Sequence, residues 1–185
     1  MERFLKEIRI HGRGGQGAGI LAELIGKAAF LEGKWPQAMA FFGAERRGAP
    51  VEAFARISDR EILVRSRVYE PDYVVVLDPT LFEIVEVSKG LKRDGTLMVN
   101  APDRPQLPES GYRVILVDAT SIALELKLVI AGQPVVNTAM LGAFAKATHE
   151  ITLQSAERVV LDEWPGEIGK RNVKAVRAAY NKVGA

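Results

Sequence analysis

The chain has 185 residues, of which 48% are hydrophobic and 26% are charged, as in an average soluble globular protein. This length favours a single domain over residues 1–185, and the composition excludes disordered, collagen-like and coiled-coil proteins. No apolar run approaches the roughly 18 residues that cross a bilayer, and the N-terminus lacks the apolar core of a signal peptide. We therefore expect a cytoplasmic protein with no membrane partner.

The charge and the residues that are missing narrow the possible functions. A net charge of +2 is too small for a general nucleic-acid binder, which carries a clustered basic face. The absence of cysteine excludes thiolate catalysis and any cysteine-ligated iron–sulfur cluster in this chain. His11 and His149 have no partner in a metal-ligand spacing. We expect no nucleic-acid partner, no metal site and no redox centre held by this chain.

The first half of the chain predicts a strand, a glycine loop and a helix, followed by more strands. Residues 8–11 alternate as a strand, and apolar residues then repeat at helical spacing over 18–30. A second strand is expected at 36–42. Residues 51–57 and 62–66 flank a turn, and this pattern predicts an antiparallel hairpin.

The second half alternates strands and helices. The β-branched run at 73–77 is typical of a strand buried on both faces, and Pro79 suits the first turn of a helix to residue 89. Further strands are expected at 96–100 and 113–118, and further helices at 119–128, 137–148, 154–161 and 170–183. The sequence thus predicts an α/β fold: three-layer and Rossmann-like, with a mostly parallel sheet, an antiparallel hairpin and C-terminal helices.

A glycine-rich loop is the strongest local signal. The segment Gly12-Arg13-Gly14-Gly15-Gln16-Gly17 satisfies the G-x-G-x-x-G template between a strand and a helix. Glycines there allow positive φ and close backbone approach, a helix N-terminus attracts phosphate, and the arginine adds a fork of donors. These six residues are candidate cofactor-binding residues; the alternative is a tight turn that binds nothing.

A second candidate site lies between the second and third predicted strands. Its candidate residues are Glu45, Arg46 and Arg47, within the segment Phe41-Phe42-Gly43-Ala44-Glu45-Arg46-Arg47-Gly48-Ala49-Pro50. Arginine forks suit phosphates or carboxylates, and the glutamate can orient an arginine or pair across an interface. The alternative is a solvated charged turn. The acidic residue that holds the ribose in dinucleotide-binding proteins is absent after the second predicted strand, which disfavours a free-standing NAD enzyme.

Other polar residues near predicted strand ends have simpler explanations. Asp78 and Asn137-Thr138 are expected to start helices, Asn100 to occupy a turn, and Asp118 either to cap a helix or to face a ligand. The sequence contains no Walker-type phosphate loop, no G-x-S-x-G elbow and no H-E-x-x-H pair. We assign no catalytic residue.

The two loops together resemble a known family. Ile10-His11-Gly12-Arg13-Gly14-Gly15-Gln16-Gly17-Ala18, followed by Phe42-Gly43-Ala44-Glu45-Arg46-Arg47-Gly48-Ala49-Pro50, is similar to the gamma subunit of 2-oxoacid:ferredoxin oxidoreductases. The later blocks Tyr69-Glu70-Pro71-Asp72, Val117-Asp118-Ala119-Thr120 and Asn137-Thr138-Ala139-Met140-Leu141-Gly142-Ala143 follow in the family's order, so the resemblance covers nearly the whole chain. It is strongest to the pyruvate and 2-oxoisovalerate enzymes.

This resemblance implies a heteromeric enzyme that converts a 2-oxoacid and coenzyme A into acyl-CoA and CO₂ while reducing ferredoxin. It implies alpha, beta and delta partner subunits, which carry thiamine diphosphate, magnesium and iron–sulfur clusters, and an isolated chain that is inactive. It also associates the gamma portion with coenzyme A, through Gly12 to Gly17 and Glu45 to Arg47. Two other hypotheses stay open: a stand-alone nucleotide- or flavin-binding oxidoreductase, and an assembly module that binds no small molecule.

Overall fold

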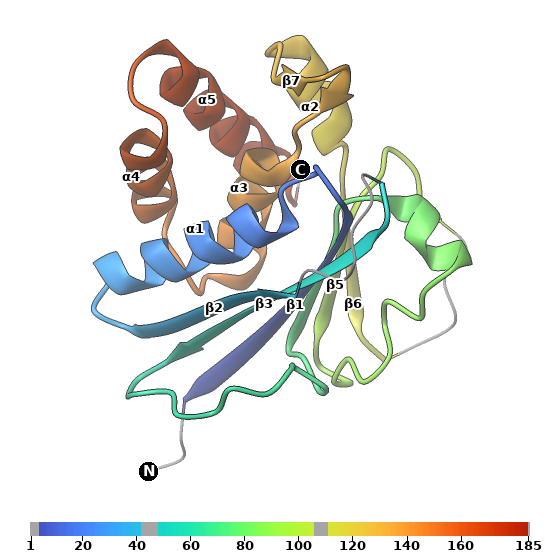
Figure 1. Ribbon diagram of the computed structural model, residues 1–185, viewed down its shortest axis with the longest axis vertical. Coiled ribbons are helices and arrows are strands. Elements are labelled where there is room, and N and C mark those ends of the chain that lie inside the picture. The colour runs from blue at the N-terminus through green and yellow to red at the C-terminus, as the bar shows by residue number, and fades with distance from the viewer. Residues whose placement is uncertain (1–3, 42–47, 106–110, 185) are drawn as a thin grey trace.

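The computed structural model describes residues 4–41, 48–105 and 111–184. Its centre is a six-stranded sheet with the order β2-β3-β1-β4-β5-β6 (Figure 1). The strands are β1 (Leu5–Arg13), β2 (Trp35–Phe41), β3 (Pro50–Ser58), β4 (Tyr73–Val76), β5 (Thr96–Asn100) and β6 (Arg113–Val117).

Only β3 runs against the other strands of this sheet. β1, β4, β5 and β6 pair in parallel, whereas β3 pairs antiparallel with both β1 and β2. β2 therefore has the same direction as β1, although β3 lies between them. The strands β1, β2, β4, β5 and β6 all end at one edge of the sheet, where α/β proteins bind ligands.

The α-helices cover one face of the sheet. They are α1 (Ala18–Leu31), α2 (Ala119–Glu125), α3 (Asn137–Thr148), α4 (Leu153–Glu163) and α5 (Glu167–Lys182). In Figure 1, α1, α3, α4 and α5 lie together on this side of the strands. The apolar residues of β1 and β3 alternate towards them, with Ile8, Ile10 and Ile57 fully buried in the main core. Burial of this apolar face supplies most of the driving force for folding.

The opposite face is covered by irregular chain. A 3₁₀ helix, η1 (Pro79–Glu83), and the segments at 59–72 and 84–95 lie over it. Under η1 is a smaller apolar cluster that includes Val74, Leu81 and Leu97. Under the loops, the sheet instead presents the buried polar residues Arg9 and Arg56.

The α/β fold with C-terminal helices is confirmed, and three local predictions are wrong. Residues 62–66 form no strand; the hairpin partner of β3 is β2, and residues 59–72 run as a loop across the sheet. The helix expected from Pro79 to residue 89 ends as one 3₁₀ turn at Glu83. The helix predicted to residue 128 ends at Glu125, and a two-stranded hairpin that the sequence did not predict, β7 (Val129–Ile130) with β8 (Gln133–Pro134), follows it.

Candidate functional site

The glycine loop lies at the edge of the sheet where the parallel strands end. β1 runs to Arg13, residues 14–17 turn, and α1 starts at Ala18. Gly15 and Gly17 have φ values of 99° and 83°, which residues with a side chain rarely adopt. A Cβ on Gly12 would lie 3.3 Å from the Leu77 side chain, so the strand end also needs a small residue. The loop has the strand–turn–helix context that the sequence predicted.

The start of α1 has no side-chain cap among the described residues. Its N-cap residue is Gly17, no described side chain accepts a hydrogen bond from the first turn, and that turn contains no acidic residue. The first N–H groups of an α-helix have no partner within the helix, and the helix dipole places partial positive charge there. This end of α1 is therefore suited to an anionic group.

Arg13 and Gln16 tie the loop to the end of β4. Asp78 Oδ2 accepts hydrogen bonds from Arg13 Nε and from Gln16 Nε2, both at 3.0 Å. Gln16 Oε1 accepts from the Arg13 backbone N–H at 2.7 Å. Arg13 also donates to the Gly48 carbonyl at 3.1 Å and to Thr80 Oγ1 at 2.6 Å. These contacts fix the loop on the side of β4.

The carboxyl group of Asp78 is held in its charged form. Partial burial alone would raise its pKa, but hydrogen bonds from Thr80 and Gln16, together with the charge of Arg13, lower the pKa below its ordinary value. Asp78 also caps η1, as predicted, by accepting from Thr80 N at 3.0 Å. Arg13 uses three of its five N–H donors in hydrogen bonds within the protein. Its main role in this structure is therefore to position the loop.

The second candidate site lies outside the described residues. Glu45, Arg46 and Arg47 belong to the stretch 42–47. Its described neighbours meet the glycine loop: Gly14 N donates to Ala49 O at 2.9 Å, and Gly48 N donates to Gly14 O at 3.3 Å. The two candidate segments are thus adjacent at Gly48.

The strand order explains the missing ribose-binding residue. In dinucleotide-binding folds the second strand pairs directly with the first, and its end places an acidic side chain on the ribose. Here β3 lies between β1 and β2, so the end of β2 is one strand further from the glycine loop. The sheet therefore does not offer the usual position for that residue.

Two of the polar residues near predicted strand ends, Asp118 and Asn100, hold together neighbouring elements. Asp118 caps α2 by accepting from Ser121 N at 2.9 Å. Asn100 ends β5 and does not form a turn: its Nδ2 donates to Leu77 O at 2.8 Å and its Oδ1 accepts from Thr120 N at 3.1 Å. These side chains connect strand ends to α2 and have no visible ligand role.

Asn137 is the residue whose role the sequence did not reveal. It is the first residue of α3, after the N-cap Val136, and is 1% exposed. Its Oδ1 accepts from Thr138 N at 2.8 Å, but its Nδ2 has no hydrogen-bond partner among the described residues. A Cβ on Gly17 would lie 2.6 Å from this Nδ2, so the amide faces the glycine loop directly.

Hollows lie on both sides of the glycine loop. One of about 360 Å³ is bounded by Gly15, Gly17 and Asn137, by the β7–β8 hairpin and by α5. Another of about 310 Å³ lies on the side of Arg13 and Glu23. The loop backbone is accessible from both.

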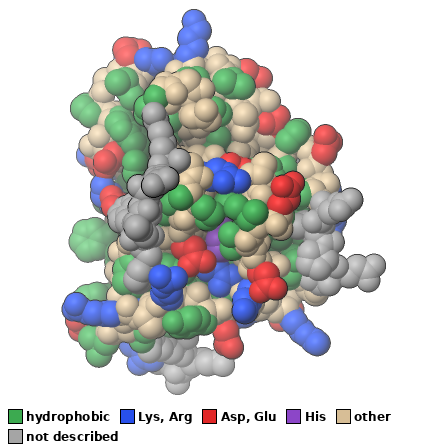
Figure 2. All heavy atoms as spheres, turned by 45° about the vertical axis from the view of Figure 1, so that its right-hand side comes forward, with side chains coloured by type: hydrophobic (Ala, Val, Ile, Leu, Met, Phe, Trp, Pro, Cys, Tyr) green, Lys and Arg blue, Asp and Glu red, His purple; other side chains and the backbone are tan. Residues whose placement is uncertain are grey.

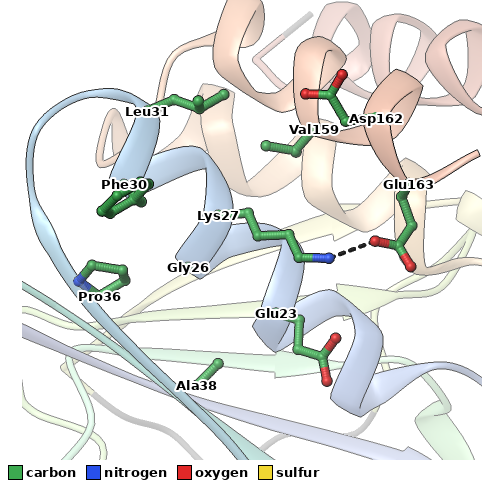
Figure 3. A pocket seen from close by; sticks show the side chains of 10 residues that line it. All are labelled: Glu23, Gly26, Lys27, Phe30, Leu31, Pro36, Ala38, Val159, Asp162 and Glu163. Atoms are coloured by element: carbon green, nitrogen blue, oxygen red, sulfur yellow. Dashed lines mark hydrogen bonds and ion pairs between the residues drawn. The ribbon is translucent and has the colours of Figure 1, made fainter.

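A separate hollow of about 550 Å³ lies near the C-terminal end of α1, between α1, α4 and β2. Figure 3 shows Phe30, Pro36 and Val159 around it, and the ion pair between Lys27 and Glu163 beside it. None of the predicted site residues contributes to this hollow. Its apolar walls offer no donor set comparable to that of the glycine loop.

His11 has a structural environment. It is 3% exposed, and its Nε2 accepts a hydrogen bond from Arg9 Nε at 3.0 Å. Burial, reinforced by the charge of Arg9, lowers its pKa to about 3, so the ring is neutral at pH 7. Among the described residues no group of three His, Cys, Asp or Glu side chains has metal-binding geometry.

The surface and helices add two observations. Figure 2 looks onto the side that lies at the right in Figure 1; the basic and acidic side chains drawn there are interspersed, with no continuous basic surface. No helix in the described part of the chain is long and apolar enough to span a bilayer.

Comparison with known proteins settles the family. A model of the family described as pyruvate ferredoxin/flavodoxin oxidoreductase matches residues 7–182. The chain belongs to this family. It is 50% identical over 181 residues to the pyruvate/ketoisovalerate oxidoreductases common subunit gamma of Thermococcus litoralis, covering 95% of this chain and 96% of the relative. The resemblance seen in the sequence is thus confirmed, and the chain is a gamma subunit of a pyruvate/ketoisovalerate ferredoxin oxidoreductase.

Solved structures agree with this assignment. The crystal structure of pyruvate oxidoreductase subunit PORC from Thermotoga maritima is 35% identical to the gamma subunit, with a TM-score of 0.82 over 97% of each chain. The 2-oxoglutarate:ferredoxin oxidoreductase from Magnetococcus marinus, solved with 2-oxoglutarate, coenzyme A and succinyl-CoA, shares the fold at a TM-score of 0.80. In that case identity is 19%, over 97% of this chain and 32% of the other.

Proposed function

We propose that this gamma subunit works in a complex that converts pyruvate or 2-oxoisovalerate with coenzyme A into acyl-CoA and CO₂ and reduces ferredoxin. In this proposal alpha, beta and delta subunits carry thiamine diphosphate, magnesium and the iron–sulfur clusters, and ferredoxin is reached through them in the cytoplasm. The absence of cysteine supports placing the clusters in other chains.

The gamma subunit contributes a contact to coenzyme A through its glycine loop. This proposal rests on the start of α1, which has no side-chain cap among the described residues. The contacts of Arg13 and Gln16 with Asp78 fix the glycine loop that precedes this helix, between two hollows. Unpaired N–H groups and a positive dipole end bind phosphate without any side chain. Coenzyme A offers phosphates and is bound in the M. marinus enzyme, which has the same fold.

Glu45, Arg46 and Arg47 belong to the same proposal. The stretch that contains them ends at Gly48, which hydrogen-bonds to both the backbone of Gly14 and the side chain of Arg13. Arginine side chains are strong donors to phosphate groups, so Arg46 and Arg47 are assigned to the same ligand. In the assembly hypothesis the same three residues contact a partner subunit instead. Their role therefore distinguishes the coenzyme hypothesis from the assembly hypothesis.

The first experiment tests the complex. The chain is tagged in its native host and pulled down without oxygen, and the eluate is assayed for coenzyme A-dependent ferredoxin reduction with pyruvate and with 2-oxoisovalerate. Activity and larger partner chains should elute together, while the recombinant chain alone should be inactive. Turnover with NAD(P)H by the chain alone, or elution without partners, would reject the subunit proposal in favour of a stand-alone enzyme.

The second experiment tests the glycine loop in the assembled complex. Gly15→Ala adds a Cβ that meets no described protein atom within 4 Å, so it projects into the open space beside the loop. Gly33→Ala is the matched control: it has the same left-handed backbone and the same free space, at the other end of α1. We expect Gly15→Ala to raise the KM for coenzyme A about tenfold or more, and Gly33→Ala to leave it unchanged.

The same assay separates the roles of the arginines. If Arg46 and Arg47 contact coenzyme A, replacing both with alanine raises KM while complex recovery stays normal. Arg158→Ala, on the exposed surface of α4, controls for the loss of an arginine. Lower recovery with an unchanged KM would instead support the assembly hypothesis.

A further inference from the structure

The strand β2 forms one edge of the six-stranded sheet. Among the described residues it pairs only with β3, on its inner side. It is 7 residues long, and its sequence contains no charged side chain. Soluble proteins usually protect a long edge with charged side chains, a bulge or a covering segment, because its free backbone groups otherwise pair with another chain. The composition of β2 therefore suits this edge to pairing.

The hydrogen-bond pattern shows which backbone groups of β2 face outwards. Successive residues of a strand direct their N–H and C=O groups to opposite sides. Leu77 N, directly after β4, donates to His11 O, so the odd-numbered residues of β1 face β4 and the even-numbered ones face β3. The antiparallel registers carry this alternation through β3 to β2. The odd-numbered residues of β2 thus bond to β3, whereas Pro36, Ala38 and Ala40 face away from the sheet.

The outward backbone groups are open to a further strand. Pro36 has no N–H, and proline is tolerated in an edge strand where its nitrogen faces away from the sheet. The described residues form no hydrogen bond with the N–H groups of Ala38 and Ala40. These donors, and the carbonyl groups on the same side, have the spacing that a β-ladder requires. Pro36 restricts a new ladder to the part of β2 that follows it.

An apolar groove runs along the same edge, between β2, α1 and α4 (Figure 3). Its volume is about 550 Å³, and it is lined by Pro36 and Ala38 from β2, by Phe30 from α1 and by Val159 from α4. The ring of Phe30 is 69% exposed. A strand that pairs with β2 directs every second side chain to this face of the sheet. These side chains would enter the groove and cover its apolar walls.

The groove has an acidic lining. It contains the carboxylates of Glu23, Asp162 and Glu163 against one ammonium group, that of Lys27. Lys27 pairs with Glu163, and Asp162 has an exposed pair with Arg158. Glu23 forms no hydrogen bond and no ion pair with any described residue. An incoming segment is therefore attracted if it carries lysine or arginine next to its apolar residues.

A second copy of this chain complements the edge poorly. Two-fold pairing of β2 with itself places the same surface on both sides of the interface. Each acidic groove would then meet another acidic groove, and like charges repel. β2 itself brings no basic side chain to offset this repulsion. The edge and the groove together fit an apolar, basic strand from a different chain.

We infer that β2 is a docking edge, where an extended, basic and apolar segment of another subunit adds a strand to the sheet of the gamma subunit. The inference rests on the proposed function, because it requires partner subunits, and it specifies how one of them is held. Main-chain hydrogen bonds hold the segment, and the groove selects its side chains. None of the candidate coenzyme-binding residues lines this groove, so docking and coenzyme binding can be tested separately.

Hydrogen exchange tests the added strand directly. The purified active complex is compared with the recombinant chain, by mass spectrometry that resolves single amides. The amides of Ala38 and Ala40 should exchange about tenfold more slowly in the complex, whereas those of Gln37 and Met39, which bond to β3, should be protected in both samples. Protection gained at alternate residues indicates strand pairing, because a surface that is merely covered shows no such alternation.

Ala38→Pro removes one outward N–H and leaves the bonds between β2 and β3 in place. Recovery of the active complex with the tagged chain should fall about tenfold, the effect of one lost hydrogen bond. Ala38→Ser is the matched control at the same position: it keeps the N–H and nearly the same size, so recovery should stay unchanged. The melting temperature of each variant chain shows whether it folds. If Ala38→Pro does not fold, hydrogen exchange in the original complex decides.

Asp162→Lys tests the charge of the occupant. It reverses one charge of the groove on α4, so recovery of the complex should fall several-fold at low salt, and the loss should shrink at high salt. Glu125→Lys is the matched control, because it reverses an exposed carboxylate on α2, outside the groove. Equal losses in the two variants would overturn the assignment of a basic segment.

The outcomes distinguish the inference from the proposed function. If Ala38 and Ala40 exchange equally fast in the active complex and in the chain alone, or if a folded Ala38→Pro variant assembles normally, the docking edge is overturned and the proposed function stands. A chain that dimerises alone, and becomes monomeric with Ala38→Pro, would assign the edge to a second copy and also overturn the inference. If the original chain elutes without active partner chains, the proposed function itself fails.

Discussion

One face of the sheet is joined to α1, α3, α4 and α5 through apolar side chains, whereas the other is joined to loops through buried polar ones. On the helix face, residues such as Ile8 and Ile10 pack through apolar contacts, which have no preferred direction. On the loop face, Arg9 donates to the carbonyls of Val68 and Val87, at 3.4 and 3.0 Å. Hydrogen bonds to backbone carbonyls are directional, so they can hold irregular chain in a fixed position over a sheet. Apolar contact alone does not fix that position.

The difference explains why loops could replace a helix layer. Gln37 Nε2 donates to Val64 O at 2.8 Å, and Arg56 donates to Arg67 O at 3.2 Å. The loop carbonyls therefore gain hydrogen-bond donors although the loop forms no strand, while Leu63 remains 76% exposed. The free energy of unfolding should accordingly be sensitive to the loss of a single polar group on the loop face. On the helix face it should be sensitive to changes in side-chain shape.

The largest effect is expected at Arg56, on the loop face. Its side chain is 1% exposed and donates to Glu7 Oε1 at 2.7 Å and to Gln37 Oε1 at 2.8 Å. Arg56→Ala removes a buried cation and leaves these half-buried acceptors without its donors, so the free energy of unfolding should fall by roughly 3 kcal/mol in denaturant titrations.

The matched control for Arg56 is Arg177→Ala on the exposed surface of α5, which removes a bidentate pair with Glu157. An exposed pair contributes less than about 1 kcal/mol. Equal losses in the two variants would show that the loop face does not depend on buried polar contacts.

On the helix face, the next largest effect is expected at Gly142 in α3. A Cβ there would lie 2.0 Å from the Val176 carbonyl oxygen of α5, so the two helices must separate. Gly142→Ala should cost roughly 2–3 kcal/mol. Gly26→Ala, inside α1, would place its Cβ at an ordinary 3.5 Å from Pro36 and should stabilise the protein by about 0.5–1 kcal/mol. Stabilisation by both variants would contradict the close packing of α3 and α5.

The helix face could be predicted from the sequence more fully than the loop face. Periodic apolar residues predicted α1 from residue 18 to 30, and the observed helix is Ala18–Leu31. The segment at 62–66 has the local pattern of a strand, but Val64 O accepts from the side chain of Gln37 on β2, and Arg67 O, just after the segment, accepts from Arg56 on β3. Local pattern does not encode such long-range bonds, so the predicted hairpin was wrong.

The candidate site shows the same limit. The turn at Gly12 to Gly17 follows from glycine spacing between a strand and a helix, whereas the contact of Arg13 with Asp78 joins residues 65 positions apart. Asn137 was predicted only as a helix-start residue, because its unpaired Nδ2 depends on the approach of α3 to the glycine loop. Burial without a partner is a tertiary property, so no sequence motif could reveal it.

The pH dependence of stability should reveal His11 on the loop face. The unfolded chain binds a proton at this histidine near pH 6.5, but burial and Arg9 lower the folded-state pKa to about 3. Between these values the unfolded state holds more protons, so stability is lost as pH falls from 6.5 towards 3. We expect a loss of about 2 kcal/mol between pH 7 and pH 5.

His11→Gln isolates this contribution, because its Oε1 can still accept from Arg9 but does not titrate. The difference in unfolding free energy between the original chain and this variant should narrow or reverse as pH falls. A difference that stays constant from pH 7 to pH 5 would show that His11 titrates normally in the folded protein.

The smallest effect is expected beside the apolar hollow at the C-terminal end of α1. Lys27 and Glu163 form an ion pair of 2.5 Å, but half of the lysine side chain is exposed (Figure 3). Water screens such a pair, so Lys27→Met should change the unfolding free energy by less than about 1 kcal/mol, measured at low and at high salt. Glu163→Gln should behave alike. A larger, salt-independent loss would mean that this pair holds α1 against α4 as Arg56 holds the loops, and the helix face would then also depend on directional contacts.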